Sequence, residues 1–168
     1  NYSMGQVVKV GEPIALKCEF GYGEFHYYRG RVNSTTTRHY LRFKGGTISV
    51  PSSAVKEIYH LETNLRDLIN DFNIKLPDRV MKAFKEQTKQ YLGRYCEMYT
   101  TGKIYKGVVT GVYLINNIHE LKLLNDCDNI DLKFGYKIVT DIGNKFLDEP
   151  LVLKVKVVTK LNKLGDDL

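Results

Sequence analysis

The sequence predicts a mainly β protein with a helical connector (α+β), in which two small β-barrels follow one another along the chain. Residues 25–59 form a compact pattern of short alternating strands with marked turns. The motif Tyr28-Arg29-Gly30-Arg31-Val32 also returns as Tyr105-Lys106-Gly107-Val108-Val109. Strongly bent strands with short links are typical of small SH3-like barrels, and a glycine is expected where such a strand bends most. Chance similarity between two amphipathic strands is the alternative to a repeat.

The first barrel is expected to span residues 1–60. Its predicted strands alternate apolar and polar residues, and Pro51 ends the ladder because proline has no N–H to donate. A single tight turn at Ser52–Val55 then leads to a last short strand through Ile58. The strands predicted before it are Pro13–Cys18, Phe25–Val32, His39–Phe43 and Thr47–Val50.

Residues 61–93 are expected to form a connector of two helices. An apolar stripe at helical spacing predicts the first helix. Pro77 and Asp78 suit the first turn of the second helix, and Gly93 suits its C-terminal cap. The stripe consists of Leu61, Leu65, Leu68, Ile69 and Phe72. A protein-docking helix pair is the functional alternative to a connector packed on the barrels.

The second barrel is expected over residues 94–160, followed by a frayed tail at 161–168. Gly102-Lys103 is predicted to be a hairpin turn, and Lys154 and Lys156 are predicted to protect an edge strand. The strands predicted here are Tyr95–Thr101, Ile104–Leu114, His119–Leu124, Asn129–Phe134, Lys137–Ile142 and Leu151–Val158.

Composition narrows the class of protein. The net charge is +6, and the first 60 of the 168 residues carry eight Lys or Arg against four acids, which favours a polyanion or an acidic partner. Ordinary solubilising charge is the alternative. No apolar run is long enough for a membrane helix. The chain starts at Asn1 without a signal segment, so it is expected to be a domain excised from a larger protein. Three cysteines without zinc spacing indicate a reduced intracellular compartment.

The sequence contains no recognisable catalytic motif. There is no phosphate-binding or dinucleotide glycine pattern, and the four histidines are scattered without metal-ligand spacing. Asp126, Asp128 and Asp131 supply only part of a calcium loop. We therefore expect a protein that is not an enzyme and that uses neither a cofactor nor a metal.

A basic surface is the strongest functional signal. Strand alternation places Arg29 and Arg31 on the face opposite Gly30 and Val32, and the same alternation applies to the next strand. Cations meet phosphate, and aromatic rings can stack on bases. The residues expected to bind nucleic acid, most simply duplex DNA without strong sequence preference, are Tyr27, Arg29, Arg31, Arg38, Tyr40, Arg42 and Lys44. An ordinary polar barrel exterior is the alternative.

Residues 8–59 resemble a Tudor domain. The resemblance lies in three stretches, Ala15–Cys18, Phe25–Val32 and Tyr40–Gly46, and Tyr105–Val109 with Asp126–Phe134 is similar to a second unit. Two such units resemble the tandem Tudor modules of DNA-damage checkpoint mediator proteins. The resemblance implies a nuclear, chromatin-associated module in which the first barrel, helped by the second, binds a methylated histone lysine, and some members also bind DNA.

The residues at the cage positions match the family only in part. Tyr28 and Phe43 occupy matching aromatic positions, and Cys18 or Phe20 stands where a larger aromatic residue is wanted. Gly45 replaces the acid, and Thr47 replaces another ring. Because a cage needs several ring faces around the cation, the resemblance implies an incomplete aromatic cage of Phe20, Tyr28 and Phe43.

Two other functions stay open at this stage. Gly102–Val109, followed by Asn117-Ile118 and Leu121, resembles the first strands of an Sm-like fold, which implies an RNA-binding or ribonucleoprotein scaffold. The second open function is that of a protein-binding adaptor that uses the helical pair. Ring-shaped oligomers would favour the first, and a monomer that binds neither nucleic acid nor histone peptides would favour the second.

Overall fold

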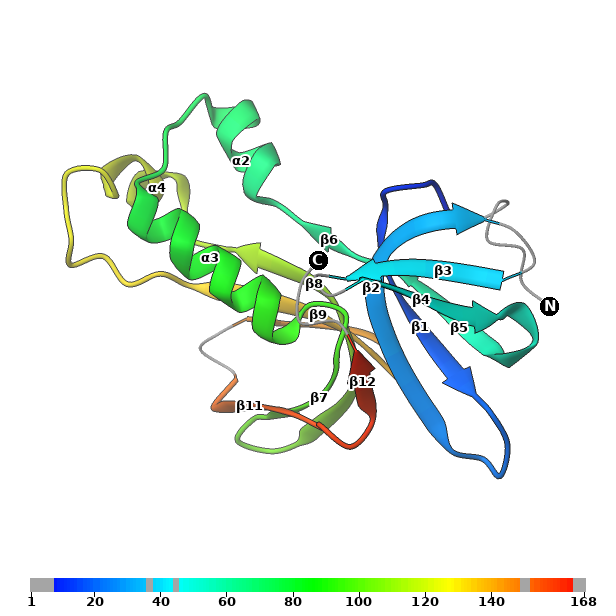
Figure 1. Ribbon diagram of the computed structural model, residues 1–168. Helices are drawn as coiled ribbons and strands as arrows, with labels where there is room; N and C mark the ends of the chain where they lie inside the picture. Colours follow the sequence, from blue (N-terminus) through cyan, green and yellow to red (C-terminus); the bar gives the residue numbers. More distant parts are fainter. Residues whose placement is uncertain (1–7, 36–37, 44–45, 149–151, 165–168) are drawn as a thin grey trace.

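The structure is a computed structural model that describes residues 8–35, 38–43, 46–148 and 152–164, without the side chains of residues 34–46, 145, 146, 148 and 164. It is mainly β, with two sheets and three short helices among the described residues. Figure 1 shows the first sheet on the right and the second sheet, together with the helices, on the left. The two sheets therefore lie side by side, with the helices on the side of the second sheet (Figure 1).

The first sheet follows the predicted strand pattern closely. Its strand order is β4-β3-β2-β1-β5, and a short 3-10 turn, η1 (Ser52–Ala54), leads into the last strand. Because β1 pairs with both β2 and β5, the last strand returns to the first. The strands are β1 (Pro13–Glu19), β2 (Phe25–Thr35), β3 (Arg38–Phe43), β4 (Gly46–Pro51) and β5 (Val55–His60).

The second sheet has the same strand order, β10-β9-β8-β7-β11. Its last strand β11 likewise returns to pair with its first strand β7. Neither sheet is closed by pairing between its two end strands within the described part of the chain. The strands are β7 (Tyr95–Tyr99), β8 (Ile104–Leu114), β9 (Phe134–Thr140), β10 (Gly143–Asp148) and β11 (Lys154–Val157).

The two glycines of the repeated motif occupy equivalent positions. Gly30 on β2 lies opposite Ile14, and Gly107 on β8 lies opposite Cys96, each the second residue of its sheet's first strand. A Cβ atom on Gly107 would lie 2.0 Å from the carbonyl oxygen of Val139, so the backbones of β8 and β9 approach too closely there for a side chain. The prediction that the motif marks a structural repeat is confirmed.

One part of the second unit differs from the predicted strands. Residues predicted as the strand His119–Leu124 form the helix α4 (Ile118–Leu123). Its cap explains the difference, because the Asn117 side chain accepts from the Glu120 amide while the Glu120 carboxylate accepts from the Asn117 amide. The predicted strand Asn129–Phe134 is also absent, since β9 begins only at Phe134. Of the residues that resemble the first Sm-like strands, residues 104–109 do lie on the strand β8, whereas Ile118 and Leu121 lie on the helix α4.

The connector contains the two predicted helices, α2 (Leu65–Phe72) and α3 (Asp78–Tyr91). Val80 and Phe84 are buried and hold α3 on the second sheet. Gly93 follows the end of α3 with φ of +78°, a conformation that favours glycine, which agrees with its predicted role as a cap.

Two short strands cross between the sheets. β6 (Glu62–Thr63) follows the first sheet but pairs with β8 of the second. β12 (Asn162–Leu164) follows the second sheet but pairs with β2 of the first. Figure 1 shows β12, in dark red, at the junction of the two sheets. The expectation of a frayed tail from Leu161 is therefore wrong for Asn162–Leu164, because these residues are hydrogen-bonded into a sheet.

An asparagine side chain holds each of the two short strands β6 and β12 in place. The Asn162 amide group accepts from the Tyr95 N–H and donates to the Tyr95 carbonyl, both at 2.9 Å. The Asn64 amide group makes the same pair of bonds with the backbone of Leu114, also at 2.9 Å. Each amide thereby satisfies one strand donor and one strand acceptor, as a further strand would.

Candidate functional site

The face of β2 that carries Tyr27 and Arg29 is buried against the second unit. Arg29 is only 1% exposed, and Tyr27 is 5% exposed with its ring centroid 4.8 Å from that of Tyr95. The prediction that these two residues lie on a free outer face is wrong, because the helical connector and β7 cover them. Tyr27 and Ala15 belong to the hydrophobic core of the second unit rather than to the core of their own sheet.

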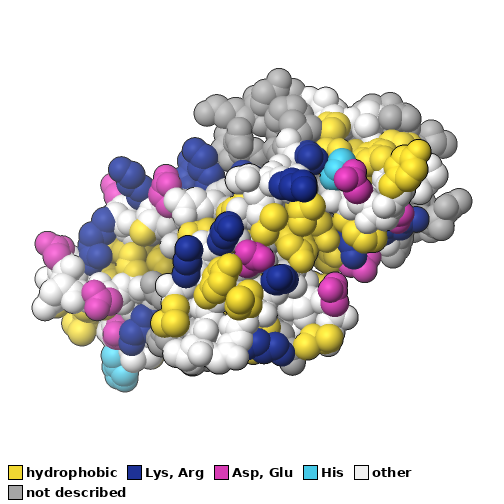
Figure 2. Space-filling view, turned by 90° about the horizontal axis from the view of Figure 1, so that it is seen from below, with side chains coloured by type: hydrophobic (Ala, Val, Ile, Leu, Met, Phe, Trp, Pro, Cys, Tyr) yellow, Lys and Arg dark blue, Asp and Glu magenta, His cyan; other side chains and the backbone are white. Residues whose placement is uncertain are grey.

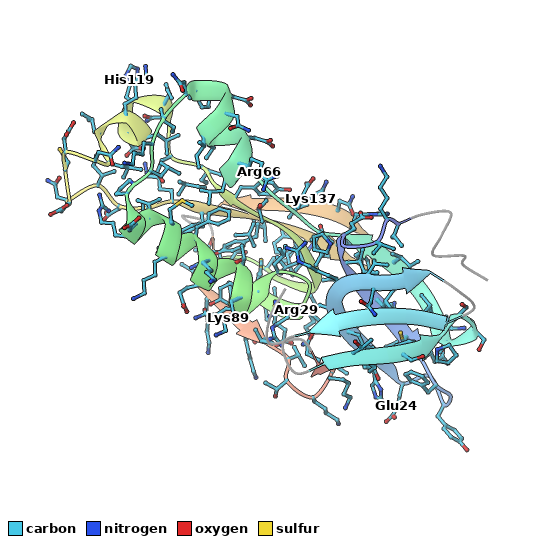
Figure 3. All side chains as sticks on the ribbon, turned by 45° about the horizontal axis from the view of Figure 1, so that its top comes forward. Glu24, Arg29, Arg66, Lys89, His119 and Lys137 are labelled. Carbon is cyan, nitrogen blue, oxygen red and sulfur yellow. The ribbon has the colours of Figure 1, made fainter. Side chains whose placement is uncertain are left out.

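Arg29 connects β2 to the C-terminal end of α3. Its Nη1 donates to the carbonyls of Leu92 at 2.5 Å and Thr88 at 3.3 Å, and its Nη2 donates to the carbonyl of Lys89 at 2.6 Å. Figure 3 shows Arg29 between this end of α3 and the strands of the first sheet. The last carbonyls of a helix have no partner within the helix and carry the negative end of its dipole, so a guanidinium is well placed there.

The packing around Arg29 explains why a glycine occurs at position 93 and why the Tyr27 hydroxyl stays neutral. A Cβ atom on Gly93 would lie 2.8 Å from Leu61 Cδ1 and 3.1 Å from Arg29 Cβ, so a side chain at this position would have to displace both neighbours. Burial raises the pKa of the Tyr27 hydroxyl, which therefore stays neutral in this interface. We call the region formed by Tyr27, Arg29, Gly93 and Tyr95 the closed interface.

An open groove lies next to the closed interface. It has a cavity volume of about 570 Å³ and runs between the β6 segment, the start of α2 and one side of α3. Its lining combines apolar residues, which we call the floor, with basic residues, which we call the rim, and we call the whole the basic groove. The floor residues are Leu61, Leu65, Met81, Phe84 and Leu92, and the rim cations are Arg31, Lys82, Lys85 and Lys89.

The rim carries a clear excess of positive charge. Glu62 is the one acid among the described residues that line the groove. Its carboxylate accepts from the Tyr113 hydroxyl and lies 3.6 Å from Lys137 Nζ, a cation outside the groove lining, so its charge is already partnered. Figure 3 shows Lys89 near the end of α3, close to the position of Arg29. The basic groove is therefore suited to an anionic ligand.

A second cavity of about 450 Å³ lies beside the closed interface and is lined by residues of β1, β2, β12 and the turn after β9. Lys17, Lys160 and Lys163 line it together with Glu24 and Asp141. Opposite charges are almost balanced there, so this cavity is a weaker candidate for an anion. Figure 2 shows one face of the molecule on which Lys and Arg side chains alternate with hydrophobic ones.

The structure places only some of the cations that the sequence analysis proposed for nucleic-acid binding. Arg31 is exposed and lines the basic groove, where its Nη1 donates to the Gly11 carbonyl at 3.0 Å. The backbone register pairs Arg31 directly with Arg42 across β2 and β3. The side chains of Arg38, Tyr40, Arg42 and Lys44 lie outside the described residues.

The predicted aromatic cage is partly assembled. Phe20 is 54% exposed, and its ring meets the buried Tyr28 ring edge-on at a centroid distance of 6.4 Å. The centroid of the His26 ring lies 6.0 Å from that of the Phe20 ring. Phe43, the third predicted ring, has a side chain outside the described residues. Two perpendicular rings form a corner rather than an enclosure.

Little in the described structure suggests metal or thiol chemistry. No cluster of His, Cys, Asp and Glu that could hold a metal occurs among the described residues. The three cysteines are free, and burial raises the pKa of the Cys18 and Cys96 thiols to about 12. No helix within the described ranges has the length and hydrophobicity to cross a membrane.

No family model, no curated protein and no solved structure matches the chain. The function must therefore be argued from the geometry of the site.

Sequence reasoning missed the α3 part of the site. Lys82, Lys85 and Lys89 fall at helical spacing on the polar side of a helix that was correctly predicted, so the signal was present. Their convergence with Arg31 depends on how α3, which is held on the second sheet, meets β2 of the first sheet, and the helical pattern does not contain this information. Asn64 and Asn162 gave no sequence signal at all.

Proposed function

We propose that this chain is a non-enzymatic nucleic-acid-binding module of the tandem Tudor-like type, which binds duplex DNA without strong sequence preference in the nucleus. The observation that carries the proposal is the basic groove, where Arg31 from β2 and three lysines from α3 surround one opening. Phosphate contacts of this kind fix a protein on the duplex without reading its sequence.

The strand register supports the same ligand class. Arg31 and Arg42 are direct partners across an antiparallel ladder, and like charges in that arrangement destabilise a sheet. A phosphate that lies near both positions would remove this repulsion. On α3, a rise of about 1.5 Å per residue places Lys82, Lys85 and Lys89 along the helix at intervals of about 4.5 and 6 Å. The cations thus form a line rather than a point.

The tandem Tudor-like architecture is supported by the strand order. Each six-stranded sheet contains the same path of five strands, in which the last strand pairs with the first, and η1 precedes that last strand in the first sheet. We propose that each sheet curves into a small SH3-like barrel. Function does not follow from this architecture alone, because a common fold carries many functions.

Fluorescence anisotropy with a labelled random-sequence duplex tests DNA binding. Affinity should fall steeply between about 50 and about 200 mM salt, because each phosphate contact releases condensed counterions. The double variant Arg31→Glu, Lys85→Glu should weaken binding to all sequences and reduce the magnitude of the salt slope by about 2. The matched control reverses Lys154 and Lys156 on β11, away from the groove lining, and should change little. A parent protein that does not bind, or equal binding by both double variants, would refute the proposal.

A histone tail is the second ligand that the Tudor resemblance suggests. With two perpendicular rings, and with Gly45 and Thr47 at the positions of the acid and another ring, we expect a methylated lysine peptide to bind weakly or not at all. Titration of trimethylated and unmodified peptides side by side tests this. Methyl-dependent binding in the low micromolar range that Tyr28→Ala abolishes would show a complete cage.

A further inference from the structure

The floor of the basic groove is apolar, and DNA binding makes no use of an apolar surface. Met81 is 38% exposed and Leu65 is half-buried, and both belong to the apolar residues that line the groove. Phosphate and sugar gain nothing from an apolar floor of this kind, whereas apolar side chains of a ligand would be removed from water there.

The rim above that floor selects the charge of the occupant. Lys82, Lys85 and Lys89 stand on the α3 side and Arg31 on the first-sheet side, while the charge of Glu62 is offset by Lys137. The negative end of the α3 dipole is covered by Arg29, so the helix end does not cancel the charge of Lys89. An acidic occupant is favoured over a basic one.

The walls of the groove are fixed before any ligand arrives. Arg29 holds the C-terminal end of α3, and the burial of Val80 and Phe84 holds its first half. Opposite α3, the β6 segment is paired with β8, and Asn64 bonds to the backbone of Leu114. A preformed groove lowers the entropy that binding loses.

We propose that the basic groove binds an acidic amphipathic helical segment of a partner protein, with the apolar side chains of the segment on the floor and its carboxylates at the rim. The volume of about 570 Å³ suits a few apolar side chains presented by adjacent turns of a helix. Because the segment and DNA would use the same rim cations, each excludes the other. Peptide binding does not require DNA binding, since the floor contacts belong to the peptide alone.

The direct test uses the full chain and a labelled synthetic peptide of about 14 residues, roughly four helical turns. Leucines at helical spacing i, i+3, i+4 and i+7 form one face, glutamates occupy most other positions, and both ends are blocked. One control peptide has the same composition with the leucines distributed around the helix. The other replaces every glutamate by lysine. The patterned acidic peptide should bind at least tenfold more tightly than either control in a fluorescence anisotropy titration. Equal binding of all three peptides would overturn the proposal.

Protein variants separate the floor from the rim. Met81→Gln should lower peptide affinity about tenfold, as expected for losing one apolar anchor, and change DNA affinity less than twofold. The matched control, Leu123→Gln, alters a comparably exposed apolar residue on α4 outside the groove lining and should change neither. Lys82→Glu with Lys85→Glu should weaken both ligands. If Met81→Gln leaves peptide binding unchanged, or lowers DNA affinity equally, the floor does not hold a peptide.

The outcomes distinguish this proposal from the DNA-binding proposal. Peptide binding with no DNA binding would refute the DNA site and leave the peptide site standing. DNA binding without discrimination between the three peptides would refute the peptide site and leave the DNA site standing. Where both bind, unlabelled duplex should displace the labelled peptide, and simultaneous binding would show that the two ligands use different surfaces.

Discussion

The closed interface and the basic groove each contain an arginine from the strand β2. Arg29 and Arg31 are two positions apart on β2, and their side chains therefore start from the same face of the strand. Arg29 is buried under the end of α3, whereas Arg31 is exposed on the rim of the groove. Tertiary packing, rather than residue type or strand alternation, decides which arginine serves the fold and which is available to a ligand.

The difference has an energetic reason. Burial of a cation costs free energy unless hydrogen bonds compensate, and the carbonyls at the end of α3 provide that compensation for Arg29. Arg31 is exposed to water, so its charge does not depend on such compensation. The comparison predicts opposite responses to substitution at the two positions.

Arg29→Ala should produce the largest effect on stability. It removes the hydrogen bonds to Thr88, Lys89 and Leu92 and leaves a void between β2 and α3, which should lower the free energy of unfolding by about 3 kcal/mol. Urea denaturation followed by circular dichroism measures the change. A loss below about 0.5 kcal/mol, the range of ordinary surface substitutions, would show that the closed interface does not hold the two units together.

Asn162→Ala should have the next largest effect. The change deletes two hydrogen bonds to the backbone of Tyr95 and one to the Val158 carbonyl, and it loosens β12 at the interface, at a cost of about 1–2 kcal/mol. Hydrogen exchange at the amides of Asn162–Leu164 should accelerate more than exchange in β9. Uniform acceleration through both sheets would instead mean that β12 has no local role. Asn144→Ala, at an exposed position on β10, is the control.

Alkaline pH should destabilise the protein through its buried thiols. The pKa of Cys18 and of Cys96 is raised to about 12 by burial, so the unfolded thiols ionise first as pH rises. Stability is therefore retained below the ordinary thiol pKa and lost between that value and about 12, by about 1.4 kcal/mol per pH unit for each thiol. Cys18→Ala with Cys96→Ala should flatten this dependence in denaturation curves measured against pH. An unchanged pH dependence would mean that other titratable groups cause it.

At neutral pH, half-buried Cys127 should be alkylated before either buried thiol.

Local patterns were sufficient to predict most of the elements. The strands of the first sheet, both connector helices and the equivalent glycines Gly30 and Gly107 follow from alternation, helical spacing and turn residues. α4 was missed because its alternating leucines suit a strand, while the decisive signal was the capping pair Asn117 and Glu120. The pairing of β6 and β12 could not be predicted, because a two- or three-residue strand has no periodicity to detect.

The candidate site was only partly visible in the sequence. Alternation correctly separated Arg29 and Arg31 from Gly30 and Val32, but it could not tell that one part of that face is covered by α3. The assumption of a free face holds at Arg31 and fails at Tyr27 and Arg29. The lysines of α3 complete the groove through contacts between segments far apart in sequence, and no local pattern reports such contacts.

The salt dependence of DNA affinity for Arg31→Gln, read beside its urea unfolding curve, tests the division between the two arginines most directly. We predict that the salt slope becomes shallower by about 1 while the free energy of unfolding changes by less than about 0.5 kcal/mol. Loss of stability comparable to that of Arg29→Ala, or an unchanged salt slope with unchanged affinity, would contradict the assignment of Arg31 to a ligand and of Arg29 to the fold.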